Sequence, residues 1–133
     1  MKLKTLIVAI AAAFCALFAT GCADSPTDVV KDFVSAAQKG DITAMKECTT
    51  GDLRKFFGMA EEEMNKKSEE EQEKSRKEMI EEMENLFKDI EYVSEDIDGD
   101  NATVKVKNNK GGEATIELKK VDGKWKIAGP EFF

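Results

Sequence analysis

The chain has 133 residues, of which 27 are acidic and 20 are basic, and its net charge at pH 7 is −7. An acidic surface repels phosphate backbones and anionic lipid, so we expect no nucleic-acid partner. The sequence has no histidine, which removes the commonest general base and transition-metal ligand, and we expect neither a metal nor a cofactor. A thiol enzyme built on Cys48 would lack its imidazole partner.

Residues 1–21 have the anatomy of an export signal. Lys2 and Lys4 lie near the start, an unbroken apolar run fills residues 6–19, and small residues follow it. This run is shorter than the roughly 20 apolar residues that a membrane-spanning helix needs. We therefore predict that residues 1–21 are a signal peptide that is removed.

Cys22 comes directly after Thr20 and Gly21, an arrangement that resembles the lipobox of bacterial lipoproteins. The resemblance implies that Cys22 is the first mature residue and carries lipid, with residues 22–24 as a short tether. Two or more acyl chains hold a protein stably in a membrane. The expected location is the bacterial cell envelope, at the outer membrane because Ala23 rather than Asp follows the cysteine. An ordinary secretory signal with an incidental cysteine is the alternative.

Cys48 is the one cysteine that remains after Cys15 leaves with the signal peptide and Cys22 takes lipid. No internal disulfide is then possible. We expect Cys48 to be a small buried hydrophobic residue, with pairing to another molecule as the alternative.

Residues 25–133 are interpreted as one small α+β domain. Ser25, Pro26 and Asp28 are typical of a helix start. That helix should end at Gly40, a second should begin at Asp41, and a third short apolar piece follows at residues 53–57. The apolar positions of the first two helices are Val29, Val30, Phe33, Val34 and Ala37, then Ile42, Ala44, Met45 and Cys48.

Residues 61–78 are highly charged, and Met64 is the one apolar residue among them. Good helix formers with opposite charges four residues apart predict a solvated helix, with a partner-binding arm or a disordered linker as alternatives. We expect this helix to continue into an apolar stripe that faces the core. The expected ion pairs are Glu62 with Lys66, Glu70 with Lys74 and Glu73 with Lys77, and the stripe is Met79, Ile80, Met83, Leu86, Phe87 and Ile90.

The last third of the chain alternates apolar and polar residues and predicts four antiparallel strands with one apolar face. Turns should fall near residues 98–101, 108–112 and 122–123. The predicted fold class is therefore α+β, with N-terminal helices packed on one face of a curved four-stranded antiparallel sheet. The sheet face should meet Val30, Phe33, Val34 and Ala37, and its residues are Val104, Val106, Ile116, Leu118, Trp125 and Ile127, with Phe132 and Phe133 closing one edge.

The order of these features resembles small bacterial lipoproteins of unknown function with a cystatin-like or nuclear-transport-factor-2-like domain of the DUF4878 type. The resemblance rests on the lipobox, the Ser25–Pro26 helix start, the break at residues 39–41, and the final strand around Trp125. It implies a sheet that wraps a long helix into a cone, which often holds a small apolar ligand or an active site. It supplies no catalytic residue.

The leading hypothesis is a lipid-anchored binding module, whose partner is a small apolar ligand or another envelope protein. Six residues could line a pocket or simply pack in the core: Phe33, Met45, Phe56, Phe57, Tyr92 and Trp125. One alternative is a cone-pocket enzyme, isomerase-like or dehydratase-like, that uses a buried carboxylate with Tyr92 as a hydrogen-bond donor. Another is an assembly or structural protein that acts through the surface of residues 61–78.

Overall fold

The computed structural model describes residues 25–129. The predicted signal peptide, Cys22 with its tether, and Phe132 and Phe133 lie outside the described residues. Within residues 25–129 the chain forms four helices followed by four strands: α2 (Pro26–Gln38), α3 (Ile42–Glu47), α4 (Gly51–Asn65), α5 (Glu69–Phe87), β1 (Glu91–Asp98), β2 (Asn101–Lys107), β3 (Glu113–Val121) and β4 (Lys124–Ile127).

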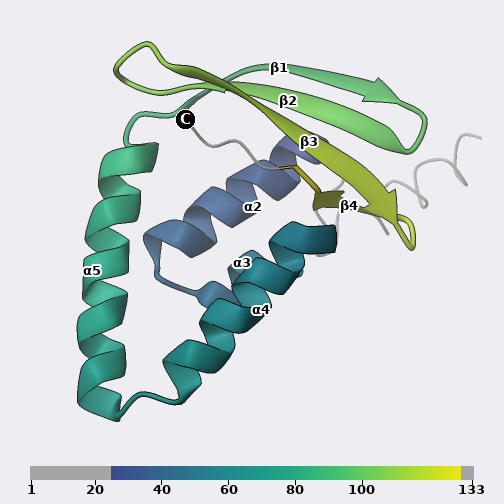
Figure 1. Cartoon of the computed structure of the whole chain (residues 1–133). Helices are drawn as coiled ribbons and strands as arrows, with labels where there is room; N and C mark the ends of the chain where they lie inside the picture. The colour runs from purple at the N-terminus through teal and green to yellow at the C-terminus, as the bar shows by residue number, and fades with distance from the viewer. Residues whose placement is uncertain (1–24, 130–133) are drawn as a thin grey trace, which may run out of the picture.

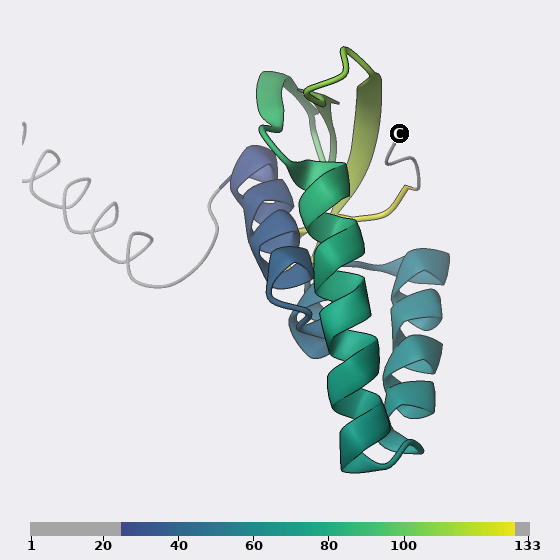
Figure 2. The ribbon, with the colours of Figure 1, turned by 90° about the vertical axis from the view of Figure 1, so that its left-hand side faces the viewer.

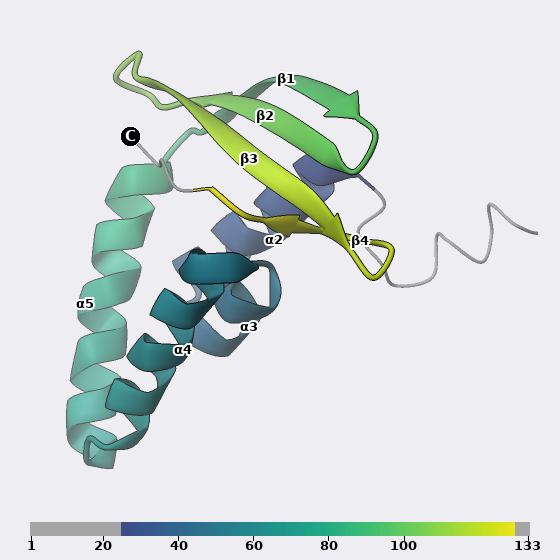
Figure 3. The same cartoon turned by 45° about the vertical axis from the view of Figure 1, so that its right-hand side comes forward.

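The strands form one antiparallel sheet in the order β1-β2-β3-β4. Residues opposite each other in the register share a face, as Val104 with Ile116 and Ala102 with Leu118 show. The helices lie on one side of the twisted sheet, and the other side is turned to solvent (Figure 1, Figure 3). The predicted fold class, α+β with helices on one face of a four-stranded antiparallel sheet, is confirmed.

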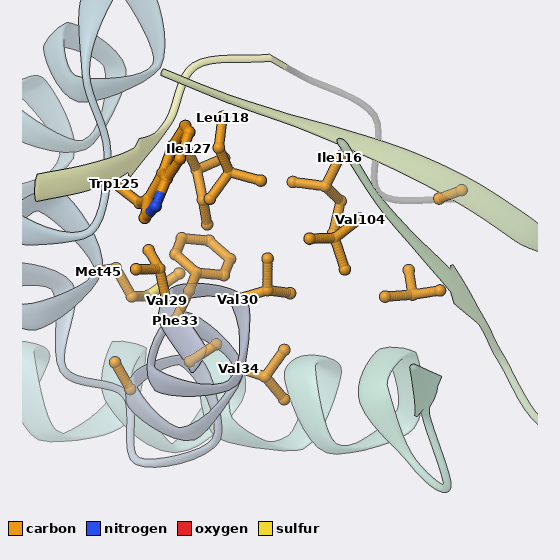
Figure 4. Close-up of a cluster of buried hydrophobic side chains, with 14 of the residues drawn as sticks. Val29, Val30, Phe33, Val34, Met45, Val104, Ile116, Leu118, Trp125 and Ile127 are labelled. Atoms are coloured by element: carbon orange, nitrogen blue, oxygen red, sulfur yellow. The ribbon is translucent and has the colours of Figure 1, made fainter. Parts of the chain in front are cut away.

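Helix α2 supplies the helical half of the core. Ser25 Oγ accepts a hydrogen bond from the backbone N–H of Asp28 at 3.1 Å, and Pro26 occupies the first turn, as the sequence predicts. The apolar stripe of α2 packs on the sheet (Figure 4). Its buried members and their sheet partners are Val30, Phe33, Val34, Ala37, Val104, Val106, Ile116, Leu118, Trp125 and Ile127.

Strand β1 contains an irregularity that its alternation does not predict. The register shifts between Tyr92, which pairs with Val106, and the residues after it, so that Glu95 pairs with Val104. Such a bulge re-aims the side chains that follow it. Glu95 Oε1 consequently accepts hydrogen bonds from the N–H of Thr27 at 2.9 Å and from its Oγ1 at 2.8 Å. The carboxylate thus joins β1 to the first turn of α2.

The single helix that we expected over residues 61–90 is wrong, because the chain turns between α4 and α5. Ser68 Oγ accepts from the N–H of Glu71, and a carboxylate oxygen of Glu71 accepts from the N–H of Ser68, both at 3.4 Å. This reciprocal capping box satisfies helix-end donors and starts α5 as a new helix. The short apolar piece at residues 53–57 is correspondingly part of a longer helix of 15 residues.

Of the three ion pairs expected along these helices, Glu73–Lys77 is the one present among the described residues, and Glu70 and Lys74 do not pair. Lys77 and Glu73 are 3.4 Å apart, as predicted, but Lys66 pairs with Glu63 rather than Glu62. The predicted apolar stripe of α5 is confirmed at its carboxyl end, where Phe87 is 2% exposed and neighbouring apolar residues of the stripe are half-buried.

Helices α4 and α5 together form an antiparallel hairpin that extends away from the sheet. Figure 2 shows the turn between them at the end of the molecule opposite the sheet. No residue of α4 is buried, and Phe87 is the one buried residue of α5. We refer to residues 51–87 as the helical hairpin and to α2 with the sheet as the body.

Candidate binding site

A cavity of about 390 Å³ lies where the turn between α2 and α3 faces the helical hairpin. We call it the Arg76 cavity. Residues from three separate segments converge on it, so it exists only in the folded domain. Its charged and hydrogen-bonding lining includes Lys39, Asp41, Thr43, Glu61, Gln72 and Arg76.

Gly40 fixes the approach of α5 to α2 beside this cavity. Its φ of +68° lies in the left-handed region that glycine adopts without strain. A Cβ at this position would lie 2.7 Å from Arg76 Cγ and 3.0 Å from Ile80 Cγ1. The glycine therefore ends α2, and its missing side chain is the space that the stem of Arg76 occupies.

Glu61 connects α4 to α3 across the cavity wall. Its carboxylate accepts a hydrogen bond from Thr43 Oγ1 at 2.7 Å and pairs with Lys46 Nζ at 3.0 Å. The Thr43 hydroxyl and then Lys46 hold the pKa of the Glu61 carboxyl below its ordinary value of 4.5. The carboxylate of Glu61 is therefore ionised at neutral pH and already has its own cation.

Lys39 and Arg76 carry the positive charge of the cavity lining. Neither makes an ion pair with any Asp or Glu among residues 25–129. Asp41, the remaining acid of the lining, accepts a hydrogen bond from the N–H of Ala44 at 3.0 Å and caps α3. Two cations without an ion-pair partner, beside two acids that already have their own partners and beside amide and hydroxyl groups, suit a small polar ligand with an acidic group.

A second cavity, of about 320 Å³, lies over the solvent side of the sheet. Asp96, Asp98 and Glu117 line it together with Lys119. Among the described residues there is no group of three or more Cys, Asp and Glu side chains placed to hold a metal ion.

The six residues proposed for a pocket lie mostly in the core. Phe33, Met45 and Trp125 are 2%, 1% and 7% exposed. Phe57 is half-buried and its ring centroid lies 5.6 Å from that of Phe33. Phe56 is 62% exposed on the outer face of α4. The cavities described above are lined by other residues, and a ligand role for the six stays a prediction.

Tyr92, the proposed hydrogen-bond donor of an enzyme, is half-buried on β1. Burial raises the pKa of its phenol, and Lys31 Nζ lies 5.3 Å from its ring centroid. Among residues 25–129 the buried polar side chain is that of Thr49, and every Asp and Glu is at least partly exposed. The described residues thus contain no buried carboxylate beside Tyr92.

Cys48 ends α3 and packs half-buried against the core. Burial, and then the charge of Asp32, raise the pKa of its thiol. The thiol therefore stays protonated at neutral pH and is a poor nucleophile. Its surroundings agree with the small hydrophobic role that the sequence predicts.

The sequence patterns did not predict a binding site at the residues of the Arg76 cavity. Lys39 and Arg76 are two cations among many, and α4 and α5 were expected to be one helix, which would keep Glu61 and Arg76 far apart. The signal that could have found the site is the Ser68-x-x-Glu71 capping box. It marks the turn that brings Gln72 and Arg76 back beside α4.

The family described as a domain of unknown function (DUF4878) matches residues 20–128. The chain belongs to this family, and the resemblance noted in the sequence is confirmed at that level. A comparison with curated proteins finds no match. Among solved structures, a Campylobacter jejuni protein described as a candidate NTF2-like transpeptidase is 20% identical, with 79% of this chain and 98% of that chain covered and a TM-score of 0.46.

No helix among the described residues is both long enough and apolar enough to cross a membrane.

Proposed function

We propose that this protein is held in the bacterial cell envelope by lipid on Cys22 and that its domain binds a small polar ligand in the Arg76 cavity. Support for the anchor is the signal-like segment that ends at Cys22. The outer membrane is the proposed site because Ala23 rather than Asp follows the cysteine.

The single observation that carries the binding proposal is the pair of cations, Lys39 and Arg76, in a cavity of about 390 Å³. Neither acid of the lining makes an ion pair with these cations, because Glu61 is paired with Lys46 at 3.0 Å and Asp41 caps α3. The lining favours a ligand with a carboxylate or phosphate group over the apolar ligand that the resemblance implies.

The proposed anchor also orients the cavity. The sequence has three residues, Ala23, Asp24 and Ser25, between Cys22 and α2, so a lipid on Cys22 would keep the start of α2 near the membrane surface. The turn of the helical hairpin lies at the opposite end of the domain (Figure 1, Figure 2). The Arg76 cavity is lined by the residues that follow α2 and would then lie farther from the membrane than the start of α2.

Membrane fractionation tests the anchor. We expect Cys22→Ser to move the protein out of the membrane fraction, and Cys48→Ser to leave it there as the matched control. Cys22→Ser protein that stays with the membrane would contradict the anchor.

Thermal shift with succinate and with inorganic phosphate tests the cavity. We expect either probe to raise the Tm of the wild type, and Arg76→Gln or Lys39→Gln to abolish the rise. Lys74→Gln removes a charge from the exposed surface of the same helix and should leave the rise intact. An equal rise in all of these variants would rule out binding at this cavity.

A further inference from the structure

The outer face of α4 carries two large apolar side chains in contact with solvent. Phe56 is 62% exposed and Met59 is 67% exposed. A spacing of three residues places them next to each other on one side of the helix. Scattered exposed apolar residues are ordinary, but adjacent ones on a helix with no buried residue mark a face that a partner could cover.

Charged residues flank this apolar pair in a regular order. Asp52 and Lys55 precede it, and Glu63 and Lys66 follow it. The two local ion pairs are long, at 3.9 Å for Lys55 with Asp52 and 3.4 Å for Lys66 with Glu63, and all four side chains are more than 70% exposed. Exposed pairs of this kind contribute little within one chain, so their charges remain available to a partner.

The positions of these charges are symmetric about Met59. Asp52 lies seven residues before it and Lys66 seven after it, while Lys55 lies four before and Glu63 four after. Offsets of four and seven residues stay on one face of a helix. The sign reverses on passing through Met59: each of these four charges has the opposite charge at the same distance on the other side, and Glu62 has Phe56 at its distance.

We propose that this face binds a second copy of the same chain, with the two α4 helices antiparallel about a two-fold axis at Met59. Rotation about that axis brings Asp52 opposite the second copy's Lys66 and Lys55 opposite its Glu63. Met59 meets its own counterpart beside Phe56. A parallel pair of the same helices would instead place like charges together, so the sequence of charges selects the antiparallel arrangement.

The size of the contact indicates a weak dimer. Helix α4 has 15 residues and is about 22 Å long, and one helix face buries less than the roughly 800 Å² per partner of a standard interface. Attachment of both copies to one membrane would raise their effective concentration. The symmetry argument itself does not depend on the anchor or on the Arg76 cavity.

Disulfide crosslinking in intact cells tests the dimer with the whole chain. In a Cys48→Ser background, Met59→Cys places two thiols at the two-fold axis, and we expect a covalent dimer on mild oxidation. The Cys48→Ser protein without Met59→Cys shows how much covalent dimer forms through other cysteines. Lys74→Cys, exposed on α5, is the matched control for random collision and should give little dimer.

Charge exchange gives the decisive result. Lys55→Glu alone, or Glu63→Lys alone, places like charges across both halves of the contact and should lower the Met59→Cys dimer about threefold or more. The double variant should recover it, and so should co-expression of the two single variants, as a heterodimer. The proposal is wrong if the single exchanges have no effect, if neither combination recovers the dimer, or if Met59→Cys links to a different protein.

Discussion

The body and the helical hairpin are stabilised by different interactions. In the body, Val30, Val104 and Ile127 are completely buried, so that burial of apolar surface holds α2 on the sheet. In the hairpin, α4 has no buried residue. Half-buried apolar residues such as Phe57 and Leu86, the Glu61 contacts with α3 and the close approach at Gly40 hold it against the rest of the domain. The body is therefore intolerant of change, whereas the hairpin leaves its charged and apolar surfaces free to bind.

Truncation of one aromatic residue in each region tests this difference with the largest expected effect. Phe33→Ala removes a side chain that is 2% exposed in the body, and we expect it to cost about 3 to 5 kcal/mol of unfolding free energy. Phe56→Ala removes the same group from the hairpin, where it is 62% exposed, and should cost less than about 1 kcal/mol. Urea unfolding measures both.

A small loss for Phe33→Ala would mean that this part of the body is a ligand cavity rather than a packed core. If the core is packed, Phe33→Ala should lose much more unfolding free energy than Phe56→Ala whether or not succinate or phosphate is present.

The contact between body and hairpin is tested at Gly40. Gly40→Ala places a Cβ 2.7 Å from Arg76 Cγ and also strains the backbone at φ +68°; we expect a loss of about 2 to 4 kcal/mol. Gly51→Ala meets nothing within 4 Å at φ +64° and should show the backbone cost alone, about 1 to 2 kcal/mol. Urea unfolding of both variants gives the difference.

That difference is the cost of moving α5 away from α2. If Gly40→Ala and Gly51→Ala lose the same unfolding free energy, α5 moves away from the new Cβ at no measurable cost. The hairpin would then be attached to the body more loosely than the structure indicates.

The start of α5 offers a smaller test inside the hairpin. Ser68→Ala removes the side chain that accepts from the Glu71 N–H and should cost about 1 kcal/mol. Thr50 occupies the equivalent position before α4 but makes no side-chain cap hydrogen bond, so Thr50→Ala should cost less. Circular dichroism during urea unfolding follows the loss of helix. A larger loss for Thr50→Ala would contradict the role of the capping box.

The body could be predicted from the sequence and the hairpin only in part. Period-two alternation on β2 and β3 and the stripe that includes Val30 and Phe33 leave each element one continuous apolar face, so their pairing follows from burial alone. The β1 bulge could not be predicted in this way, because the alternation of β1 does not show it and the Glu95–Thr27 contact that accompanies it joins residues far apart in the sequence.

In the hairpin, propensity and charge spacing fit one long helix as well as two, and burial does not decide between them. The two hydrogen bonds of the capping box at Ser68 favour two helices over one. The Arg76 cavity depends on that turn and on the missing side chain of Gly40. Local patterns therefore predicted α2 and the strands but not the division between α4 and α5, and the site follows from contacts between elements that the pattern of apolar and charged residues does not contain.

The smallest expected effect is the pH dependence of the contact between α3 and α4. Hydrogen bonds from Thr43 and Lys46 lower the pKa of Glu61 below its ordinary value of 4.5. A carboxylate with a lowered pKa adds stability that is fully present above pH 4.5 and is lost as the pH falls through the folded-state pKa. Wild type should therefore be more stable than Glu61→Gln at pH 7, and the difference in Tm should shrink below about pH 4.5.

Glu62→Gln is the matched control, because it removes an adjacent exposed carboxylate without touching Thr43 or Lys46. Its difference from wild type should vary less with pH. If the Tm difference for Glu61→Gln were the same at pH 7 and pH 3, the Thr43–Glu61–Lys46 contact would not be what joins α3 to the hairpin.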